Sequence, residues 1–122
     1  MKTRALAIGV FPLLFALGIQ EAIAGECISR PEHFELRSDT VHWSFEVRGG
    51  LECLQGLRGR TMLLDDVSLV APPSAGAVTI SGPSFRYKAP SGPANDSFKI
   101  SITGQNRRQH GTSVIVVDVA VR

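Results

Sequence analysis

The sequence predicts an all-β protein, an antiparallel β-sandwich of about seven or eight short strands. Three observations lead to this fold class. Apolar and polar side chains alternate over much of residues 25–122, which is the period of half-buried strands. Glycine and proline interrupt the alternation at short intervals, as turns between strands require. No stretch of this region combines helical periodicity with helical length, so we expect no helix there.

Residues 1–24 have the composition of a secretory signal peptide. Lys2 and Arg4 precede an apolar run from Ala5 to Ile19, and Ala22–Ala24 supplies the small residues of a cleavage site. We expect cleavage after Ala24, which leaves residues 25–122 as one domain without a membrane span. The alternative is a leader retained as an anchor, although the apolar run is short for a span of ~20 residues.

Length and charge narrow the class of the mature domain. Residues 25–122 have about the size of an immunoglobulin-type sandwich, so we expect an immunoglobulin-like fold. The whole chain carries a formal net charge of only +2, and part of that charge lies in the leader. Non-specific nucleic-acid binding needs a strong positive field, so we expect no nucleic-acid partner.

Two cysteines, Cys27 and Cys53, both lie in the mature domain. In an exported protein such a pair is most simply a disulfide. A loop of this length corresponds to about 3 kcal/mol of stabilisation in the chain-entropy model. The alternative, a pair of free thiols serving as metal ligands, lacks a Cys-x-x-Cys spacing. We therefore predict a Cys27–Cys53 disulfide and a periplasmic or secreted location.

The first half of the domain contains one clear strand, Thr40–Arg48, in which apolar and polar side chains alternate strictly. Its apolar face consists of Val41, Trp43, Phe45 and Val47. Before it, His33–Leu36 is expected as a short edge strand. After the tight turn at Gly49-Gly50, Leu51–Leu57 is expected to pair with it.

The next segment, Thr61–Val70, predicts a further strand with a change of phase. Met62–Leu64 and Val67–Leu69 place their apolar side chains on opposite faces. A β-bulge near Asp65-Asp66 reconciles the two phases. The alternative is a helical turn over Met62–Leu64.

The stretch Pro72–Phe98 has the strongest strand pattern and reads as three short strands separated by turn residues. We expect its three aromatic residues, Phe85, Tyr87 and Phe98, to supply much of the core, at about 1.5–3 kcal/mol for each buried ring. The third strand is expected to continue over Asp96–Thr103, after a loop formed by Pro90–Asn95.

A polar hairpin loop, Gly104–Gly111, and a last strand, Thr112–Val121, complete the expected fold. The last strand has apolar residues on both faces, because Val114 and Val116 oppose the main apolar face. Such a strand is either covered on both faces or offers an edge to a partner by strand addition. The sequence leaves both readings open.

Three motifs carry a resemblance to a known family. They are Pro73-x-x-Gly76-x-Val78-x-Ile80, Phe85-x-Tyr87-x-Ala89-Pro90 and Asp96-Ser97-Phe98. In order and spacing they resemble the bacterial Ig-like and cadherin-like repeats, over about the second half of the mature chain. The resemblance implies a sandwich fold in an exported or surface protein. Within these motifs we expect Gly76 to relieve a turn and Asp96 to accept a hydrogen bond from a loop N–H.

We searched the sequence for catalytic and metal-binding patterns. The histidines His33, His42 and His110 fall in three separate segments, and the only adjacent carboxylates are Asp65 and Asp66. Neighbours along a strand point to opposite faces, so this pair is not expected to act as an acid–base couple. We expect no catalytic residue, no metal site and no cofactor.

Two alternatives to that expectation remain. One is a loop-built hydrolase or metal-dependent enzyme, whose candidates are His42, Asp65, Asp66 and His110. The other is a calcium site using Asp65, Asp66 and Asp96, but the closely spaced acidic loop that calcium prefers is missing.

Basic residues give the one candidate binding surface. Arg86, Lys88 and Lys99 fall on the polar faces of their expected strands, and Arg107 and Arg108 fall in the following hairpin. Together they would form a positive patch for an anionic glycan or lipid headgroup, or simply a solvated face. The sequence thus predicts an exported, non-enzymatic Ig-like module with a binding, adhesion or structural role in the bacterial envelope. An envelope protein or an anionic glycan is its expected partner.

Overall fold

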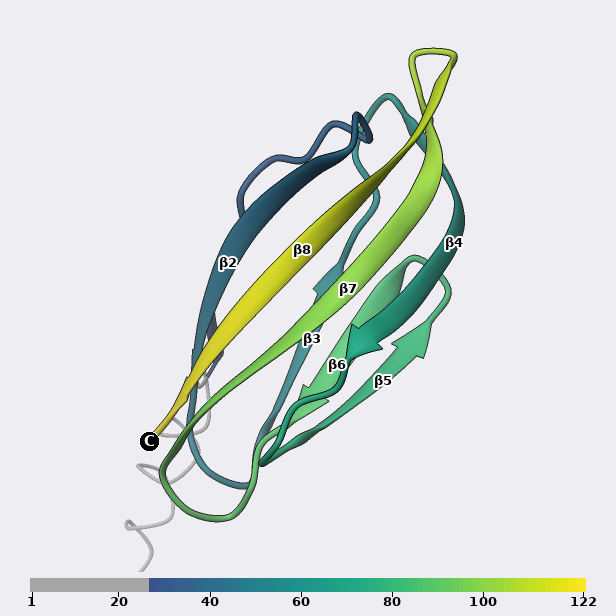
Figure 1. The fold of residues 1–122 in the computed structure, drawn as a ribbon. Coiled ribbons are helices and arrows are strands. Elements are labelled where there is room, and N and C mark those ends of the chain that lie inside the picture. Colours follow the sequence, from purple (N-terminus) through teal and green to yellow (C-terminus); the bar gives the residue numbers. More distant parts are fainter. Residues whose placement is uncertain (1–26) are drawn as a thin grey trace, which may run out of the picture.

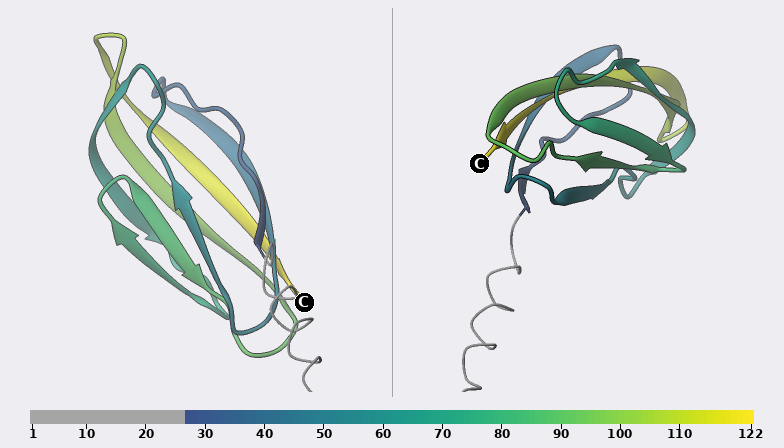
Figure 2. Two further views of the ribbon diagram at one scale, coloured as in Figure 1. Left: turned by 180° about the vertical axis from the view of Figure 1, so that it is seen from behind. Right: turned by 90° about the horizontal axis from the view of Figure 1, so that it is seen from below.

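The computed structural model describes residues 27–122, which form two β-sheets packed face to face (Figures 1 and 2). The predicted signal peptide and its cleavage position after Ala24 lie outside the described residues. The eight strands are β1 (Cys27–Arg30), β2 (Asp39–Val47), β3 (Glu52–Gly56), β4 (Met62–Ala71), β5 (Ala77–Ser81), β6 (Ser84–Lys88), β7 (Ala94–Asn106) and β8 (Gln109–Val121). No element within residues 27–122 is a helix, and hence none is a helix long and apolar enough to cross a membrane.

The larger sheet has the order β1-β2-β8-β7-β4 and the smaller sheet has the order β3-β6-β5. The smaller sheet corresponds to strands B, E and D of an immunoglobulin domain, and β4, β7 and β8 correspond to C, F and G. All strand pairs are antiparallel except β2 and β8, which run parallel over the full length of β2. The predicted immunoglobulin-like β-sandwich is therefore confirmed, with one parallel pair added.

Alternating side chains from both sheets fill the interior. Trp43 and Phe45 from β2 contact Phe85 from β6, at ring-centroid distances of 6.4 and 5.8 Å. Phe98 from β7 meets Phe85 edge-on at 5.4 Å and stacks on Tyr87 at 5.7 Å. Such aromatic pairs add to the free energy gained from their burial. Every aromatic side chain in residues 27–122 is buried, as the alternation predicted for the central stretch.

The predicted disulfide is present between Cys27 and Cys53, whose Cα atoms are 5.7 Å apart. Cys27 lies on β1 of the larger sheet and Cys53 on β3 of the smaller sheet. The bond therefore links the two sheets along one side of the sandwich. Cys53 is fully buried in the core.

Asp96 joins the loop before β5 to the core. Its carboxylate accepts hydrogen bonds from the backbone N–H groups of Ser74, Ala75 and Gly76 and from the Tyr87 hydroxyl. Gly76 is required here, because a Cβ atom would lie 2.6 Å from Tyr87 Cζ. The predicted hydrogen bond from a loop N–H to Asp96 is therefore confirmed, and the cluster joins residues of all three motifs.

In the first half, one predicted strand and one predicted strand pairing are wrong. His33–Leu36 is not a strand, although Phe34 and Leu36 are buried, and the edge of the larger sheet is β1 instead. The predicted strand Leu51–Leu57 forms β3, but β3 pairs with β6 in the other sheet and not with β2. A short Gly-Gly turn normally joins paired strands, whereas here Gly49-Gly50 leads the chain across to the second sheet. Gly49 N–H donates to the Arg122 carbonyl at 2.8 Å.

The second half needs smaller corrections. A register shift between Leu64 and Asp66 confirms the predicted bulge, and Met62–Leu64 is extended rather than helical. The predicted loop Gly104–Gly111 is mostly strand, because β7 and β8 pair up to Asn106 and Gln109. Of the two readings left open for Thr112–Val121, an edge for a partner is wrong, because β8 is bonded on both sides by β2 and β7.

Candidate binding site at one end of the sandwich

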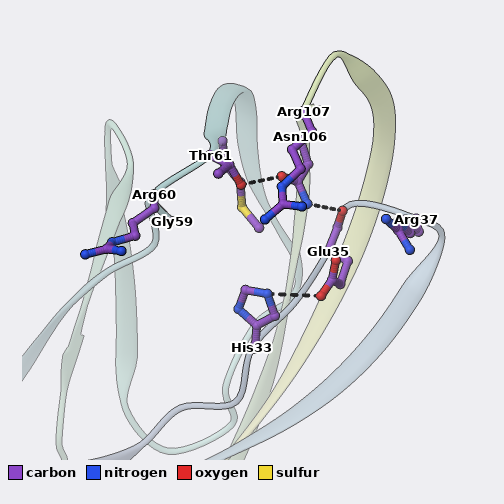
Figure 3. A pocket seen from close by; sticks show the side chains of 9 residues that line it. His33, Glu35, Arg37, Gly59, Arg60, Thr61, Asn106 and Arg107 are labelled. Carbon is purple, nitrogen blue, oxygen red and sulfur yellow. Dashed lines mark hydrogen bonds and ion pairs between the residues drawn. The ribbon is translucent and has the colours of Figure 1, made fainter.

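A pocket of about 430 Å³ lies at the end of the sandwich that carries the β7–β8 turn (Figure 3). Three segments meet there: residues 31–38 between β1 and β2, residues 57–61 between β3 and β4, and the turn itself. The lining residues are His33, Glu35, Arg37, Gly59, Arg60, Thr61, Met62, Asn106 and Arg107. The C-terminus lies at the opposite end of the molecule (Figure 1).

The first wall, residues 31–38, is held by side chains from the larger sheet. Asp39 accepts hydrogen bonds from the backbone N–H groups of Glu35 and Arg37, both at 2.9 Å. The Ser113 hydroxyl donates to Asp39 at 2.6 Å and accepts from Leu36 N–H at 2.8 Å. Burial raises the pKa of Asp39, but these hydrogen bonds outweigh it and the pKa lies below its usual value. Asp39 and Ser113 thus fix the backbone that carries Arg37.

A close approach between this wall and β8 explains one glycine. The Leu36 carbonyl lies so near Gly111 that a Cβ atom there would collide with it. Leu36 itself has a φ of 60° and Ser38 a φ of 61°, and side-chain-bearing residues adopt this left-handed region at a cost of roughly 1–2 kcal/mol. The wall is therefore held in a locally strained conformation by the contacts around it.

The second wall, residues 57–61, is joined to the first by Asn106. The Thr61 hydroxyl donates to Asn106 Oδ1 at 2.6 Å, and Asn106 Nδ2 donates to the Glu35 carbonyl at 3.1 Å (Figure 3). Arg107 N–H also donates to the Thr61 carbonyl at 3.3 Å. Asn106 is buried at the end of β7. Asn106 thus bonds to both walls from the end of β7 and sets the distance between them.

The pocket is predominantly basic. Arg37, Arg60 and Arg107 are exposed, and none of them forms an ion pair with another residue of the described part of the chain. The only carboxylate in the lining, Glu35, lies 3.0 Å from His33. Unpaired guanidinium groups present planar, charged donors that suit carboxylate, sulfate and phosphate groups. The arrangement is therefore able to bind an anion.

The structure does not bring the five predicted patch residues together. Arg86 and Lys88 lie on the outer face of the smaller sheet, and Lys99 lies on the outer face of the larger sheet, on the other side of the sandwich. Arg86 is also 3.4 Å from Glu52. Arg107 and Arg108 occupy the β7–β8 turn at the end of the molecule. Only Arg107 of the five belongs to the pocket.

The residues considered for an enzyme are likewise dispersed. His42 pairs in register with Val116, whereas His110 pairs with Gln105; six residues of β8 separate these positions, about 20 Å along a strand. Asp65 and Asp66 line a separate hollow between β4 and the β5–β6 turn. Across residues 27–122, no three His, Cys, Asp or Glu side chains form a cluster able to hold a metal ion.

Asp96, one of the three carboxylates considered for a calcium site, is engaged within the protein. Asp96 lies buried on β7, and both of its oxygens accept hydrogen bonds from the protein. Burial raises the pKa of Asp96, but bonds from Gly76, Tyr87, Ser74 and Ser97 hold that pKa below its usual value. Burial and the hydrogen bond with Asp96 raise the pKa of Tyr87. The role of Asp96 is therefore structural.

Sequence reasoning missed most of the pocket. Arg37, Arg60 and Asn106 stand in separate segments without a shared motif, and only the parallel β2–β8 pairing places residues 31–38 beside the β7–β8 turn. The pair Arg107-Arg108 was the one local signal, because arginines at a hairpin tip are unusual turn residues.

No protein-family model matches this chain, and no curated protein matches its sequence. The resemblance to bacterial Ig-like and cadherin-like repeats therefore stays a prediction, and the site is interpreted from its own chemistry.

Proposed function

We propose that this protein is an exported, non-enzymatic Ig-like module of the bacterial envelope, and that it binds an anionic partner through its basic end. The kinship to bacterial Ig-like and cadherin-like repeats is part of this proposal. The leader-like residues 1–24 and the Cys27–Cys53 disulfide support export, because disulfides persist in oxidising compartments.

One observation carries the binding role. Arg107 and Arg108 have φ values of 51° and 73° and form a two-residue turn between β7 and β8. Such a turn requires positive φ at both central residues and favours Asn-Gly. Two arginines there are unfavourable for stability, and strained backbone concentrates at functional sites. We interpret the turn as placing the Arg107 side chain in the pocket that Arg37 and Arg60 also line.

The proposal is tested by capture from envelope fractions. The exported, oxidised protein is immobilised through its C-terminus, which lies away from the pocket. The variant R37S/R60S/R107S removes three charges at the pocket. The matched control R86S/K88S/K99S removes three charges from the two sheet faces.

We expect the wild type and the control to retain a salt-sensitive envelope component, and the pocket variant to lose it. Equal retention by all three proteins contradicts a role of the basic end. Loss in the control alone would locate binding on the sheet faces instead.

A further inference from the structure

A second hollow adjoins the pocket and shares lining residues with it. This hollow has a volume of about 300 Å³ and shares His33, Gly59 and Met62 with the first. Its remaining lining residues are Pro31, Glu32, Phe34, Trp43, Gln55, Gly56, Leu57 and Arg58. The two hollows share three lining residues and lie next to each other between residues 31–37 and residues 55–61; we refer to them together as the groove.

The walls of this groove are fixed along its length. At one end, the Trp43 indole N–H donates to the Glu32 carbonyl at 2.7 Å. At the other end, Asn106 bonds to Thr61 and to the Glu35 carbonyl. Leu57 N–H donates to the Pro83 carbonyl at 2.8 Å. A groove with walls held in this way is preorganised, so a ligand entering it pays little for ordering the protein.

The basic side chains are spread along the groove rather than gathered at one point. In Figure 3, Arg60 and Arg37 lie on opposite sides of the pocket, and Arg107 lies between them. Arg58 adds a further charge in the second hollow. Groups that bind Arg37 and Arg60 would therefore lie on opposite sides of the pocket, which suits a chain with repeated negative charges.

The uncharged groups of the lining indicate the type of chain. Hydroxyl, amide, imidazole and carboxylate groups are interspersed with the arginines, at Thr61, Asn106, His33 and Glu35. This mixture of donors and acceptors suits a ligand rich in hydroxyl groups as well as charge. Phe34 and Trp43 line the second hollow but are only 5% and 3% exposed, so they offer little ring surface on which a neutral sugar could stack.

Strand addition by a peptide is disfavoured at the groove. Peptides gain affinity at a sheet edge by pairing with free main-chain groups. At the groove, the Gly56 carbonyl at the end of edge strand β3 accepts from the Gln55 side chain at 2.9 Å. One main-chain acceptor that an added strand would use is therefore already occupied.

We infer that the groove binds a segment of an acidic polysaccharide, with uronate or sulfate groups on Arg37, Arg60 and Arg107 and sugar hydroxyls on the neutral lining. This inference rests on the proposed function and names the partner of the same site. Binding is carried by charge-assisted hydrogen bonds and weakens with salt.

Titration calorimetry with defined polymers tests the inference. The full oxidised protein is titrated with polygalacturonate, heparin, neutral dextran, poly-glutamate and sodium sulfate. We expect binding to one or both acidic polysaccharides, weaker binding to poly-glutamate, and no binding to dextran or sulfate. Substitution R37S/R60S/R107S should weaken polysaccharide binding by about tenfold or more, and R86S/K88S/K99S should leave it within about twofold.

A second variant guards against misfolding. The variant R37K/R60K/R107K keeps the charge but loses the planar donors, so we expect intermediate affinity with unchanged circular dichroism. Poly-glutamate binding as tightly as the polysaccharides overturns the inference in favour of an acidic protein, and binding of free sulfate alone overturns it in favour of a small-anion site. If envelope capture depends on the three arginines but no acidic polysaccharide binds, the proposed function stands and this inference fails.

Discussion

At the scale of single residues, Asp96 is the clearest example of a motif residue with a structural role. Its carboxylate accepts from Gly76 N–H and from the Tyr87 hydroxyl, each at 2.8 Å. The substitution Asp96→Asn removes one acceptor oxygen and the negative charge, which leaves buried donors without partners. We expect a loss of about 2 kcal/mol or more in the free energy of unfolding, measured by urea denaturation at pH 7. A loss below about 0.5 kcal/mol contradicts the role assigned to this cluster.

The lowered pKa values of Asp39 and Asp96 also predict how stability depends on pH. A carboxyl group whose pKa is lower in the folded state contributes stability above its unfolded pKa of about 3.9. That contribution is lost as the pH falls through the lower, folded pKa. We expect the contribution of these two groups to the free energy of unfolding to be nearly constant between about pH 5 and 7. Below about pH 4 this contribution should decrease. The double variant D39N/D96N should show a smaller fall below pH 4 than the wild type; an equal fall would assign acid sensitivity to other carboxylates.

At the scale of elements, the β7–β8 turn links stability to the proposed binding role. Replacement of Arg107-Arg108 by Asn-Gly supplies the residues that the positive φ values favour. We expect R107N/R108G to raise the unfolding free energy by about 1–2 kcal/mol and to weaken binding at the basic end. Thermal denaturation and envelope capture on the same variant measure both effects. An unchanged or lower stability would show that the turn is not strained as we describe.

A second element, the short strand β1, is held in place by the disulfide. β1 pairs only with β2 over four residues, and the Cys27–Cys53 bond joins it to β3. Both groove walls follow directly, residues 31–37 after β1 and residues 55–61 after Cys53. We expect C27S/C53S to lose about 3 kcal/mol of stability and to show faster amide exchange in β1 and in residues 31–35. Unchanged exchange in those residues would indicate that β1 is held by its pairing alone.

At the scale of the whole molecule, the sequence predicted the fold class and most strand positions but not which strands are neighbours. Alternation along Thr40–Arg48 correctly gives the buried face of β2, since Trp43 and Phe45 are in the core. It does not give the partner, because the parallel pairing of β2 with β8 joins residues far apart in the chain. The same limit explains the predicted patch: the outward side chains Arg86 and Lys99 were identified correctly, but their sheets face opposite directions.

The candidate site was less predictable than the fold for a related reason. Its walls are irregular segments without a hydrophobic period, and its charged residues have no fixed spacing in the sequence. The position of Arg37 depends on hydrogen bonds that the backbone N–H groups of Arg37 and Leu36 donate to Asp39 and Ser113. The contacts with Ser113 on β8 join residues far apart in the chain and form only when β2 and β8 pair, so a local pattern does not reveal them.

The most direct test of this account is a hydrogen-exchange footprint of the oxidised protein with and without envelope extract. The account predicts slower amide exchange in residues 31–38, 57–61 and 106–109 on binding, and no such protection in R37S/R60S/R107S. Protection confined to the outer face of either sheet, with the basic end unchanged, would contradict it.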